Sequence, residues 1–363
     1  MANFVCPFRY EEYDKSKVLY VCGDCGDVVT PKTFESEPIK CKSGHIANIR
    51  KCPICGNVIP ATALQNPNLL FSIVGGIESG KTNYITVMLE ELRNLSDLSL
   101  ALAPQNDITR EHQNENFRRI YEGHTIPEVT RSGTEIPQIW SISNLQRQSK
   151  HKTPTYTFTI YDGAGEDYEN NFDPSTNFCR YVKVSKSIIL TVDPLVLSNI
   201  RRGGVVDPDV MRNSLGGKEG SIKKAEDVVN SAAAYIKNTK GIRYDLKLSI
   251  PVAVVLTKFD TILNHKSFGP QALIRKKSLT IRDGKVDTSE IEEVNDEIRN
   301  WLKEIRENNF INTLETHFKE FKFFGVSSFG ASPKADKTLA GEPQPHRVLD
   351  PLLWLFQKAR FID

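Results

Sequence analysis

The sequence predicts an α/β fold, in which a mixed, mainly parallel sheet is flanked by helices and preceded by a small metal-binding module. Two observations lead to this prediction. From about residue 69 onward, short apolar runs typical of buried strands alternate with longer runs that have helical periodicity. Six of the seven cysteines lie at or before position 55, which marks the start of the chain as a separate unit.

A glycine-rich loop, GGIESGKT at positions 75–82, has the G-x-x-x-x-G-K-[ST] pattern of a phosphate-binding loop. An apolar run at 69–74 supplies the preceding strand, and an amphipathic run after it supplies the helix. In such a loop the backbone N–H groups surround phosphate oxygens, the lysine reaches the β- and γ-phosphates, and the last hydroxyl binds Mg²⁺. The predicted nucleotide contacts are Gly75, Glu78, Ser79, Gly80, Lys81, Thr82 and Asn83.

The 363 residues suffice for one large domain with insertions or for two domains of ordinary size. The composition, 39% hydrophobic and 25% charged, is that of a soluble globular protein. No apolar run approaches the ~20 residues that span a bilayer, and the first residues lack a secretory signal, so we expect a cytoplasmic protein. A net charge of +2 gives no support for a nucleic-acid partner.

Residues 1–60 are predicted to form a zinc-ribbon-like module, joined by a linker at 61–68 to the larger domain. Closely spaced cysteine pairs favour a metal over disulfides in a protein without a secretory signal. Two C-x-x-C knuckles each precede a glycine, and a third pair joins a cysteine to a histidine. Cys6 stands alone, because Arg9 occupies the place of a second cysteine.

The seven ligands allow two pairings. Interleaved pairs, as in a cross-brace, give one complete zinc site from Cys22, Cys25, Cys52 and Cys55 and leave Cys6, Cys41 and His45 as an incomplete second site. Sequential pairs instead give one ion to Cys22, Cys25, Cys41 and His45. The interleaved arrangement is our prediction. Because so short a module builds only a small core, zinc would supply much of its folding free energy, about 10 kcal/mol.

Two further strands are predicted at 136–143 and 155–161, and the second ends at Asp162-Gly-Ala-Gly165-Glu166. An aspartate in this position can hold Mg²⁺ through water, while the N–H of Gly165 can contact a γ-phosphate and sense its loss.

The next strands, at 187–192 and 252–256, are continuous apolar runs, and the second leads into Thr257-Lys258-Phe259-Asp260. A carboxylate at Asp260 can accept hydrogen bonds from two guanine N–H groups that adenine does not present, and the Lys258 stem can lie along the purine. Alone, Asp260 would be read as a helix N-cap. A last strand at 321–326 leads into Ser327-Ser328, where a backbone N–H can meet the guanine O6.

Between and after these strands the sequence predicts a helix from 221 to about 240 and a long amphipathic helix from about Ile291 to Lys319. Ser289 and Glu292 have the spacing of a capping box at its start. The segment from 348 to 361 closes the domain. A mobile insertion is expected near 201–220 and a basic, irregular one near 264–286.

In this order, GGIESGKT, DGAGE, TKFD and VSS resemble the motifs of translation-factor-like (TRAFAC) P-loop GTPases, over residues 69–363. The cysteine leader and the IVG…GKT and VDP strings are also similar to the bacterial double-GTPase group of predicted conflict or defence gene clusters. The resemblance implies a P-loop GTPase fold, Mg²⁺ and GTP or GDP as ligands, two switch segments that follow the γ-phosphate, and another GTPase as a partner.

The chain departs from the GTPase pattern at two positions. Thr257 stands where the guanine motif usually has asparagine, which weakens the guanine preference only slightly. Glu166 stands where Ras-like proteins have a glutamine that orients water, and a carboxylate cannot donate the amide N–H. Slow hydrolysis follows from this difference, unless Glu166 faces solvent and another residue or a partner supplies catalysis. For the first switch we expect Thr130 to bind Mg²⁺.

The sequence therefore predicts a slow GTPase that acts as a nucleotide-dependent switch, with Lys81, Glu166 and Thr130 as catalytic residues and with the zinc module contacting a protein partner. Two alternatives stay open: a binding scaffold in which the nucleotide is structural, and an ATPase that shares only the phosphate loop.

Overall fold

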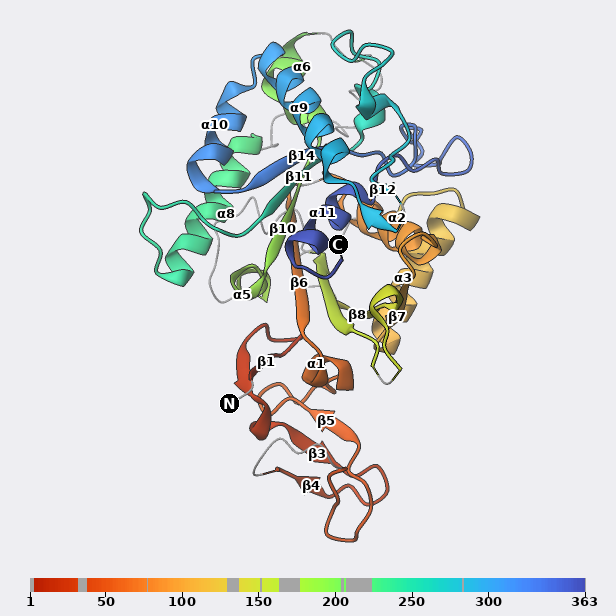
Figure 1. The fold of residues 1–363 in the computed structure, drawn as a ribbon, viewed down its shortest axis with the longest axis vertical. Helices are drawn as coiled ribbons and strands as arrows, with labels where there is room; N and C mark the ends of the chain where they lie inside the picture. Colours follow the sequence, from red (N-terminus) through yellow and green to blue (C-terminus); the bar gives the residue numbers. More distant parts are fainter. Residues whose placement is uncertain are drawn as a thin grey trace.

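A seven-stranded sheet organises the larger part of the chain, and a small module that contains the N-terminus extends from one end of it (Figure 1). The structure is a computed structural model that describes residues 3–31, 38–76, 78–128, 137–150, 152–162, 177–203, 206, 224–282 and 284–362. The predicted mixed, mainly parallel sheet flanked by helices is confirmed.

The strands of the large sheet lie in the order β14 (Phe321–Gly325), β11 (Val252–Leu256), β10 (Ser187–Val192), β6 (Asn68–Gly75), β9 (Thr155–Asp162), β8 (Pro137–Asn144) and β7 (Leu100–Pro104). The strands from β14 to β9 are parallel, whereas β8 and β7 run antiparallel to their neighbours. Parallel strands end at one edge, so the loops after β6, β9, β11 and β14 come together there.

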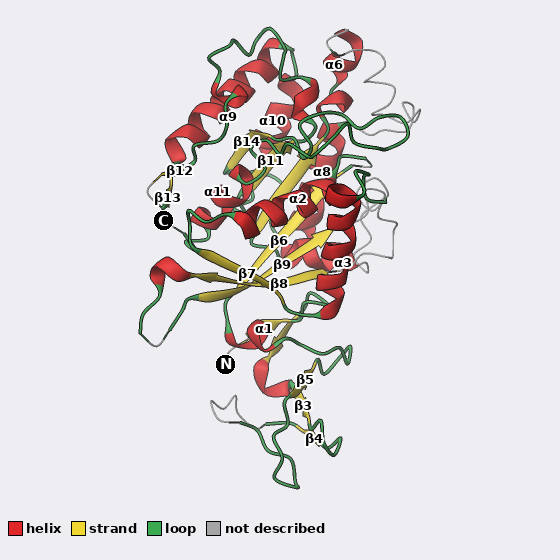
Figure 2. Cartoon of the chain, turned by 90° about the vertical axis from the view of Figure 1, so that its right-hand side faces the viewer, coloured by secondary structure: helices red, strands yellow, loops and turns green. Residues whose placement is uncertain are grey.

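Alternate residues of β6 divide the core between the two faces of the sheet. Leu70 and Val74 belong to a cluster that α5 (Asn177–Val184), α8 (Ala225–Lys240) and α10 (Asn308–His317) cover. Phe71 and Ile73 belong to the opposite cluster, which α2 (Lys81–Asn94) and α11 (Asp350–Lys358) cover. Figure 2 shows the sheet between these helices. Burial on both faces explains why the central strands are continuous apolar runs.

The segment between the phosphate-loop helix and residue 135, for which the sequence predicts no strand or helix, contains β7 and α3 (Asp107–Phe117). The helix was missed because the residues it buries are Thr109, Gln113 and Asn116, so it has no apolar stripe. The strand was missed because it forms the sheet edge, and its alternating leucines and alanines are only partly buried or exposed.

The predicted helix from 291 to 319 is in fact two helices, α9 (Thr288–Glu304) and α10. The break falls at Arg306, whose φ of 64° is left-handed and cannot continue a right-handed helix. The start also differs from the predicted capping box, because Asp287 is the N-cap and accepts from the Ser289 N–H at 2.9 Å. α8 begins at Ala225, within the predicted helix.

Of the predicted insertions, 264–286 contains a hairpin of β12 (Ile281–Arg282) and β13 (Lys285–Val286). Near 201–220 the structure describes the end of α6 (Ser198–Gly203) and residue 206, and the rest lies outside the described residues. No helix in the described ranges has the length and apolar character needed to cross a membrane.

The N-terminal module pairs β1 (Asn3–Val5) with β2 (Glu12–Asp14), and β3 (Leu19–Val21) with both β4 (Val28–Val29) and β5 (Ile49–Lys51). The predicted linker holds a short helix, α1 (Ala61–Gln65). Its Ala63 and Leu64 are buried in the same apolar cluster as Phe4 and Cys52. This segment therefore packs as part of the module.

A buried ion cluster joins α9 to the start of α11, and it provides a test of the fold. Arg347 donates to Glu290 at 2.5 Å and to Asp350 at 2.9 Å, and all three residues are at most 6% exposed. Replacing Arg347 by methionine leaves two buried carboxylates without their cation. We expect the free energy of unfolding to fall by about 3–5 kcal/mol in urea titrations.

The control is Arg243→Met, because Arg243 pairs with Asp245 on the surface with 78% of its side chain exposed. Its loss should change the free energy of unfolding by less than about 1 kcal/mol. Equal effects of the two substitutions would contradict the buried-cluster explanation.

Candidate functional site

The phosphate loop connects the end of β6 to the start of α2. Gly80 is the N-cap of α2 with a left-handed φ of 76°, and no side chain caps the first turn. The N–H groups at this helix end therefore point to the site of an anion, as the motif predicts. Lys81 is 7% exposed, and its ammonium donates to the carbonyls of Gly75 and Gly76 at 2.9 and 3.0 Å.

Gly75, at the end of β6, lies close against Thr191 of β10. A Cβ atom on Gly75 would lie 2.0 Å from Oγ1 of Thr191 and 2.6 Å from its carbonyl oxygen. The Thr191 hydroxyl also lies 3.0 Å from the Ser79 hydroxyl. Only glycine fits here without movement of the strand, because one contact is to backbone.

The predicted magnesium residues lie together. Thr82, in the first turn of α2, donates to Oδ2 of Asp162 at 2.7 Å, and Asp162 is the last residue of β9. Asp162 is 3% exposed. A hydroxyl and a carboxylate side by side at the phosphate loop are oxygen ligands of the type that Mg²⁺ takes in nucleotide sites.

Thr257, at the end of β11, connects the predicted base-binding motif to the phosphate loop. Its hydroxyl donates to the carbonyl of Ser79 at 2.8 Å, and the residue is 4% exposed. The next residue, Lys258, has a left-handed φ of 49° and pairs with Asp193 at 2.7 Å. This ion pair fixes the lysine stem beside the end of β10.

Asp260 and Ser327, from the ends of β11 and β14, are in direct contact. The Ser327 hydroxyl donates to Oδ1 of Asp260 at 2.6 Å and accepts from the Gly330 N–H at 2.9 Å. Burial raises the pKa of Asp260, and the hydrogen bond from Ser327 opposes that rise. The carboxylate is thus held in one orientation at the edge where the phosphate loop also lies.

The remaining predicted site residues divide into two groups. Glu78, Asn83 and Ser328 are described and partly exposed, in the phosphate loop, on α2 and after β14 respectively. Thr130, Gly165 and Glu166 lie outside the described residues, so both switch predictions stay predictions.

Two residues of the site were not predicted from the sequence, Thr191 and Asp193. Thr191 supports the phosphate loop through Gly75 and Ser79, and Asp193 is the partner of Lys258. Both lie at the carboxyl end of β10, next to β6 in the sheet. That position, at the same edge as the four motifs, is the signal that could have identified them.

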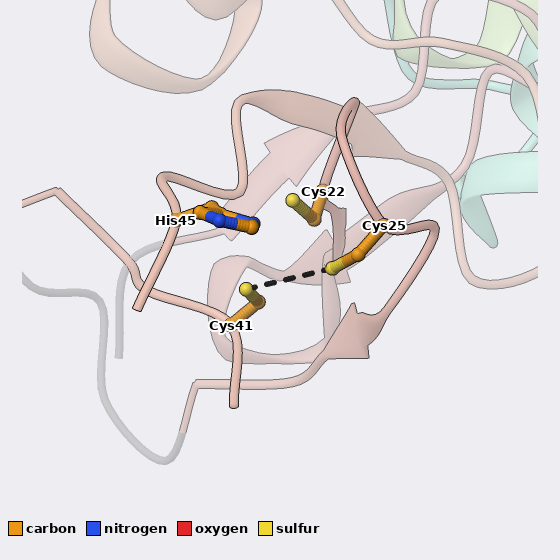
Figure 3. A group of neighbouring side chains, drawn as sticks. All are labelled: Cys22, Cys25, Cys41 and His45. Atoms are coloured by element: carbon orange, nitrogen blue, oxygen red, sulfur yellow. Dashed lines mark hydrogen bonds between the residues drawn. The ribbon is translucent and has the colours of Figure 1, made fainter. Parts of the chain in front are cut away.

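The module brings seven potential metal ligands into two groups. Cys22, Cys25, Cys41 and His45 form the first, with their ligand atoms within 4.8 Å of one another. Figure 3 shows the four side chains converging, with a line between the Cys25 and Cys41 sulfur atoms, which lie 3.6 Å apart. Hydrogen bonding, first from the backbone N–H of Cys25, lowers the pKa of Cys22 to about 7, whereas against the backbone hydrogen bond from Asp27 the thiols of Cys22 and Cys41 raise the pKa of Cys25 to about 11.

The second group is Cys6, Cys52 and Cys55. The interleaved pairing is therefore wrong, and the groups follow the sequential alternative. The reason is the antiparallel pairing of β3 with β5, which places Val21 opposite Ile49 and Leu19 opposite Lys51. The knuckles that follow these two strands consequently lie at opposite ends of the strand pair and cannot share one ion.

The chemistry of the first group fits zinc, because three thiolates and an imidazole make a closed tetrahedral set. Its ligands come from two tight turns, in which the Cys22 N–H bonds to the Asp27 carbonyl and the Cys41 N–H bonds to the His45 carbonyl, each at 2.9 Å. The backbone thus aims all four side chains at one point.

No known family's sequence profile matches the chain, and no curated protein matches it. Solved structures do. A bacterial selenocysteine-specific elongation factor, EF-Sec, matches at 12% identity with a TM-score of 0.30, covering 82% of this chain and 29% of that one. The S. cerevisiae Ski7 GTPase-like domain bound to GTP matches at 14% with a TM-score of 0.35, covering 81% and 50%. Sup35 complexed with GDP matches at 10% with a TM-score of 0.25, covering 74% and 39%.

The chain thus spans half or less of the length of these proteins. At these identities and TM-scores the similarity adds nothing to the residue contacts described above. It does not test the resemblance to the double-GTPase group.

The Gly75 contact predicts the effect of a single methyl group. In Gly75→Ala, the new Cβ would overlap Thr191 and push the phosphate loop away from β10. We expect a loss of about 1–3 kcal/mol in urea unfolding and weaker nucleotide binding. Gly269→Ala is the matched control, because nothing lies within 4 Å of its Cβ position. A Gly75→Ala protein as stable as the control would contradict the close contact.

Proposed function

We propose that this chain is a GTP-binding protein that hydrolyses GTP slowly with Mg²⁺ and acts as a nucleotide-dependent switch. One observation carries the proposal: motifs spread from residue 75 to residue 328 meet through direct hydrogen bonds at the carboxyl edge of the parallel strands. Thr82 bonds to Asp162, Thr257 bonds to the Ser79 carbonyl, and Ser327 bonds to Asp260. An ordinary glycine-rich turn needs none of these contacts.

The phosphate end of this site would work by electrostatics. The N–H groups at the start of α2, where no side chain caps the helix, and the Lys81 ammonium, which the Gly75 and Gly76 carbonyls hold beside the loop, would stabilise the charge that develops on the β- and γ-phosphates. Thr82 and Asp162 would hold Mg²⁺, which supplies further positive charge when it is bound. In the switch segment outside the described residues, Glu166 can accept a hydrogen bond from water but cannot donate an amide N–H, which supports a low intrinsic rate.

The base end of the site supports guanine over adenine. Ser327 holds one oxygen of Asp260, and the carboxylate can accept from the N1–H and 2-amino groups of guanine. The ion pair with Asp193 holds Lys258 in place, and the aliphatic stem of the lysine can then lie along the purine face. Adenine has no donors in the matching positions, so its binding would leave the partly buried carboxylate without a partner from the base.

For the N-terminal module we propose a structural zinc at Cys22, Cys25, Cys41 and His45 and contact with a protein partner. Several of the large apolar side chains that the described residues expose belong to this module: Val28, Ile46, Ile54 and Val58. Exposed aliphatic side chains favour a protein surface over nucleic acid, which would require clustered positive charge. Another GTPase is the partner that the double-GTPase resemblance suggests.

The test is a titration of the full chain with fluorescent GTP and ATP analogues in Mg²⁺, followed by phosphate release. We expect a guanine preference that falls about 10- to 100-fold in Asp260→Ala, because a charged hydrogen-bond acceptor is lost. Asp245→Ala, at an exposed aspartate, is the control. Hydrolysis should fall at least about 100-fold in Lys81→Ala.

The outcomes separate the alternatives. Binding of GTP without phosphate release would favour the scaffold, in which the nucleotide is structural. Equal affinity for GTP and ATP in the parent protein would favour an ATPase and overturn the role of Asp260.

Zinc at the first group has its own test. Cys41→Ser should remove one zinc per chain in metal analysis and abolish the ordered near-ultraviolet signals of the module, because metal supplies much of the folding free energy of so small a unit. Asp24→Ala is the control, since Asp24 lies exposed in the same turn as Cys22 and Cys25 and is not a member of the group. An unchanged zinc content in Cys41→Ser would rule the site out.

A further inference from the structure

The turn that begins at Cys6 has the backbone of a zinc knuckle. In each of three turns the N–H of the first cysteine donates to the carbonyl five residues later, and the N–H four residues later donates back to the cysteine carbonyl, all at 2.8–3.0 Å. The fifth residue of each turn has a left-handed φ, between 55° and 74°. The turns begin at Cys6, Cys22 and Cys52.

The Cys6 turn differs from the other two at two neighbouring positions. Its fourth residue is Arg9, where the other turns have a second cysteine, and its fifth residue is Tyr10, where they have glycine. A tyrosine with a φ of 55° is strained in a way that glycine is not. Something other than the turn must therefore hold Tyr10 in place.

Residues of the sheet domain hold Tyr10 in place. Its ring is 2% exposed and packs edge-on against Tyr161 and Tyr181, with centroid distances of 5.4 and 4.8 Å. The next residue, Glu11, pairs with Arg180 at 3.4 Å. These contacts anchor the Cys6 turn in the main core.

The two tyrosines that contact Tyr10 connect it to β9 and to α5. Tyr161 directly precedes Asp162, the carboxylate that bonds to Thr82. Tyr181 lies on α5 and donates to the Thr159 carbonyl at 2.7 Å. If Asp162 moved when the nucleotide changed, Tyr161 would move with it and would pass the displacement on to the ring of Tyr10.

The other side of the turn faces a cluster of thiols. Cys6, Cys52 and Cys55 have sulfur atoms within 4.8 Å of one another, and Cys6 and Cys55 lie 3.9 Å apart. Three thiols at this spacing suit a thiophilic cation such as Zn²⁺. Among the described residues the group offers three ligands, because Arg9 stands where a fourth thiolate would be.

We propose that Cys6, Cys52 and Cys55 form a second zinc site, whose fourth ligand comes from outside the Cys6 turn, and that Tyr10 links the occupancy of this site to the bound nucleotide. The metal site stands on the thiol geometry alone, whereas the linkage rests on the proposed GTP binding. In this proposal GTP and its Mg²⁺ strengthen the hold that Thr82 already has on Asp162 at the phosphate loop, which keeps Tyr161 against Tyr10 and the Cys6 turn closed on the metal. By reciprocity, the metal then favours GTP over GDP.

The first experiment counts metal in the full chain. We expect two zinc ions per chain, falling to one in both Cys25→Ser and Cys55→Ser, which change equivalent positions of two knuckles. The spectrum of the cobalt-substituted protein should separate the sites, because Cys25→Ser leaves the three-thiolate site and Cys55→Ser leaves the site with histidine. One zinc per chain, lost only in Cys25→Ser, would overturn the second site.

The second experiment measures how fast a competing chelator removes the second zinc from GTP-loaded and GDP-loaded protein. We expect removal about fivefold or more slower with GTP, the lower end of usual coupling between sites. In Tyr10→Gly the zinc content should stay at two and the difference between nucleotides should vanish. Glycine suits the left-handed position, as at Gly26 and Gly56, so this variant removes the ring and keeps the turn.

Tyr244→Gly is the control, since Tyr244 is 65% exposed and lies outside the Tyr10 contacts. Equal removal rates in the two nucleotide states of a protein that binds both would overturn the linkage. If Tyr10→Gly kept the parent protein's difference in removal rate between the GTP-loaded and GDP-loaded states, the role of Tyr10 would be overturned. If the chain bound no guanine nucleotide, the proposed function and the linkage would fail together, and the metal count would still decide the second site.

Discussion

The structure of the site depends on the close approach of β6 and β10 at Gly75. Because Gly75 has no side chain, Thr191 can reach both the end of β6 and the Ser79 hydroxyl, which fixes the phosphate loop against the centre of the sheet. Thr257, which follows the next strand β11, also holds this loop through the Ser79 carbonyl. A loop held by its neighbours keeps its N–H groups in position without a ligand, and that preorganisation is what electrostatic stabilisation of phosphates requires.

The same contacts bear on the threonine that stands in place of the usual asparagine of the guanine motif. An asparagine amide offers two donors and an acceptor, whereas a hydroxyl offers one donor beside its acceptor oxygen. At Thr257 that donor is used on the Ser79 carbonyl, so the connection between the segment after β11 and the phosphate loop is kept. In the proposed function, recognition of the base would then fall to Asp260, which Ser327 orients, and to Lys258, which Asp193 holds. These two residues follow β11 like Thr257, but the partners that hold them come after β14 and β10.

The parallel strands and the motifs after them could be predicted because each strand is an apolar run and each motif follows its end directly. Other parts depend on information that local sequence does not contain. α3 buries polar residues such as Gln113, so it shows no apolar stripe. The break between α9 and α10 depends on one left-handed residue, Arg306. The metal groups depend on the antiparallel register of β3 with β5, which no spacing of cysteines can reveal.

The two changes in the Cys6 turn are best understood together. If the turn served only to bind metal, a cysteine at position 9 and a glycine at position 10 would give a closed site without strain, as in the Cys22 and Cys52 turns. Arg9 removes a ligand, and Tyr10 adds a contact with the residue before Asp162. Because Arg9 leaves the Cys6 turn with one thiolate instead of two, the turn contributes less to the metal site and its position depends more on the contact of Tyr10 with the sheet domain. The missing thiolate and the aromatic contact are thus the two features that the proposed linkage needs, and they occur at adjacent positions.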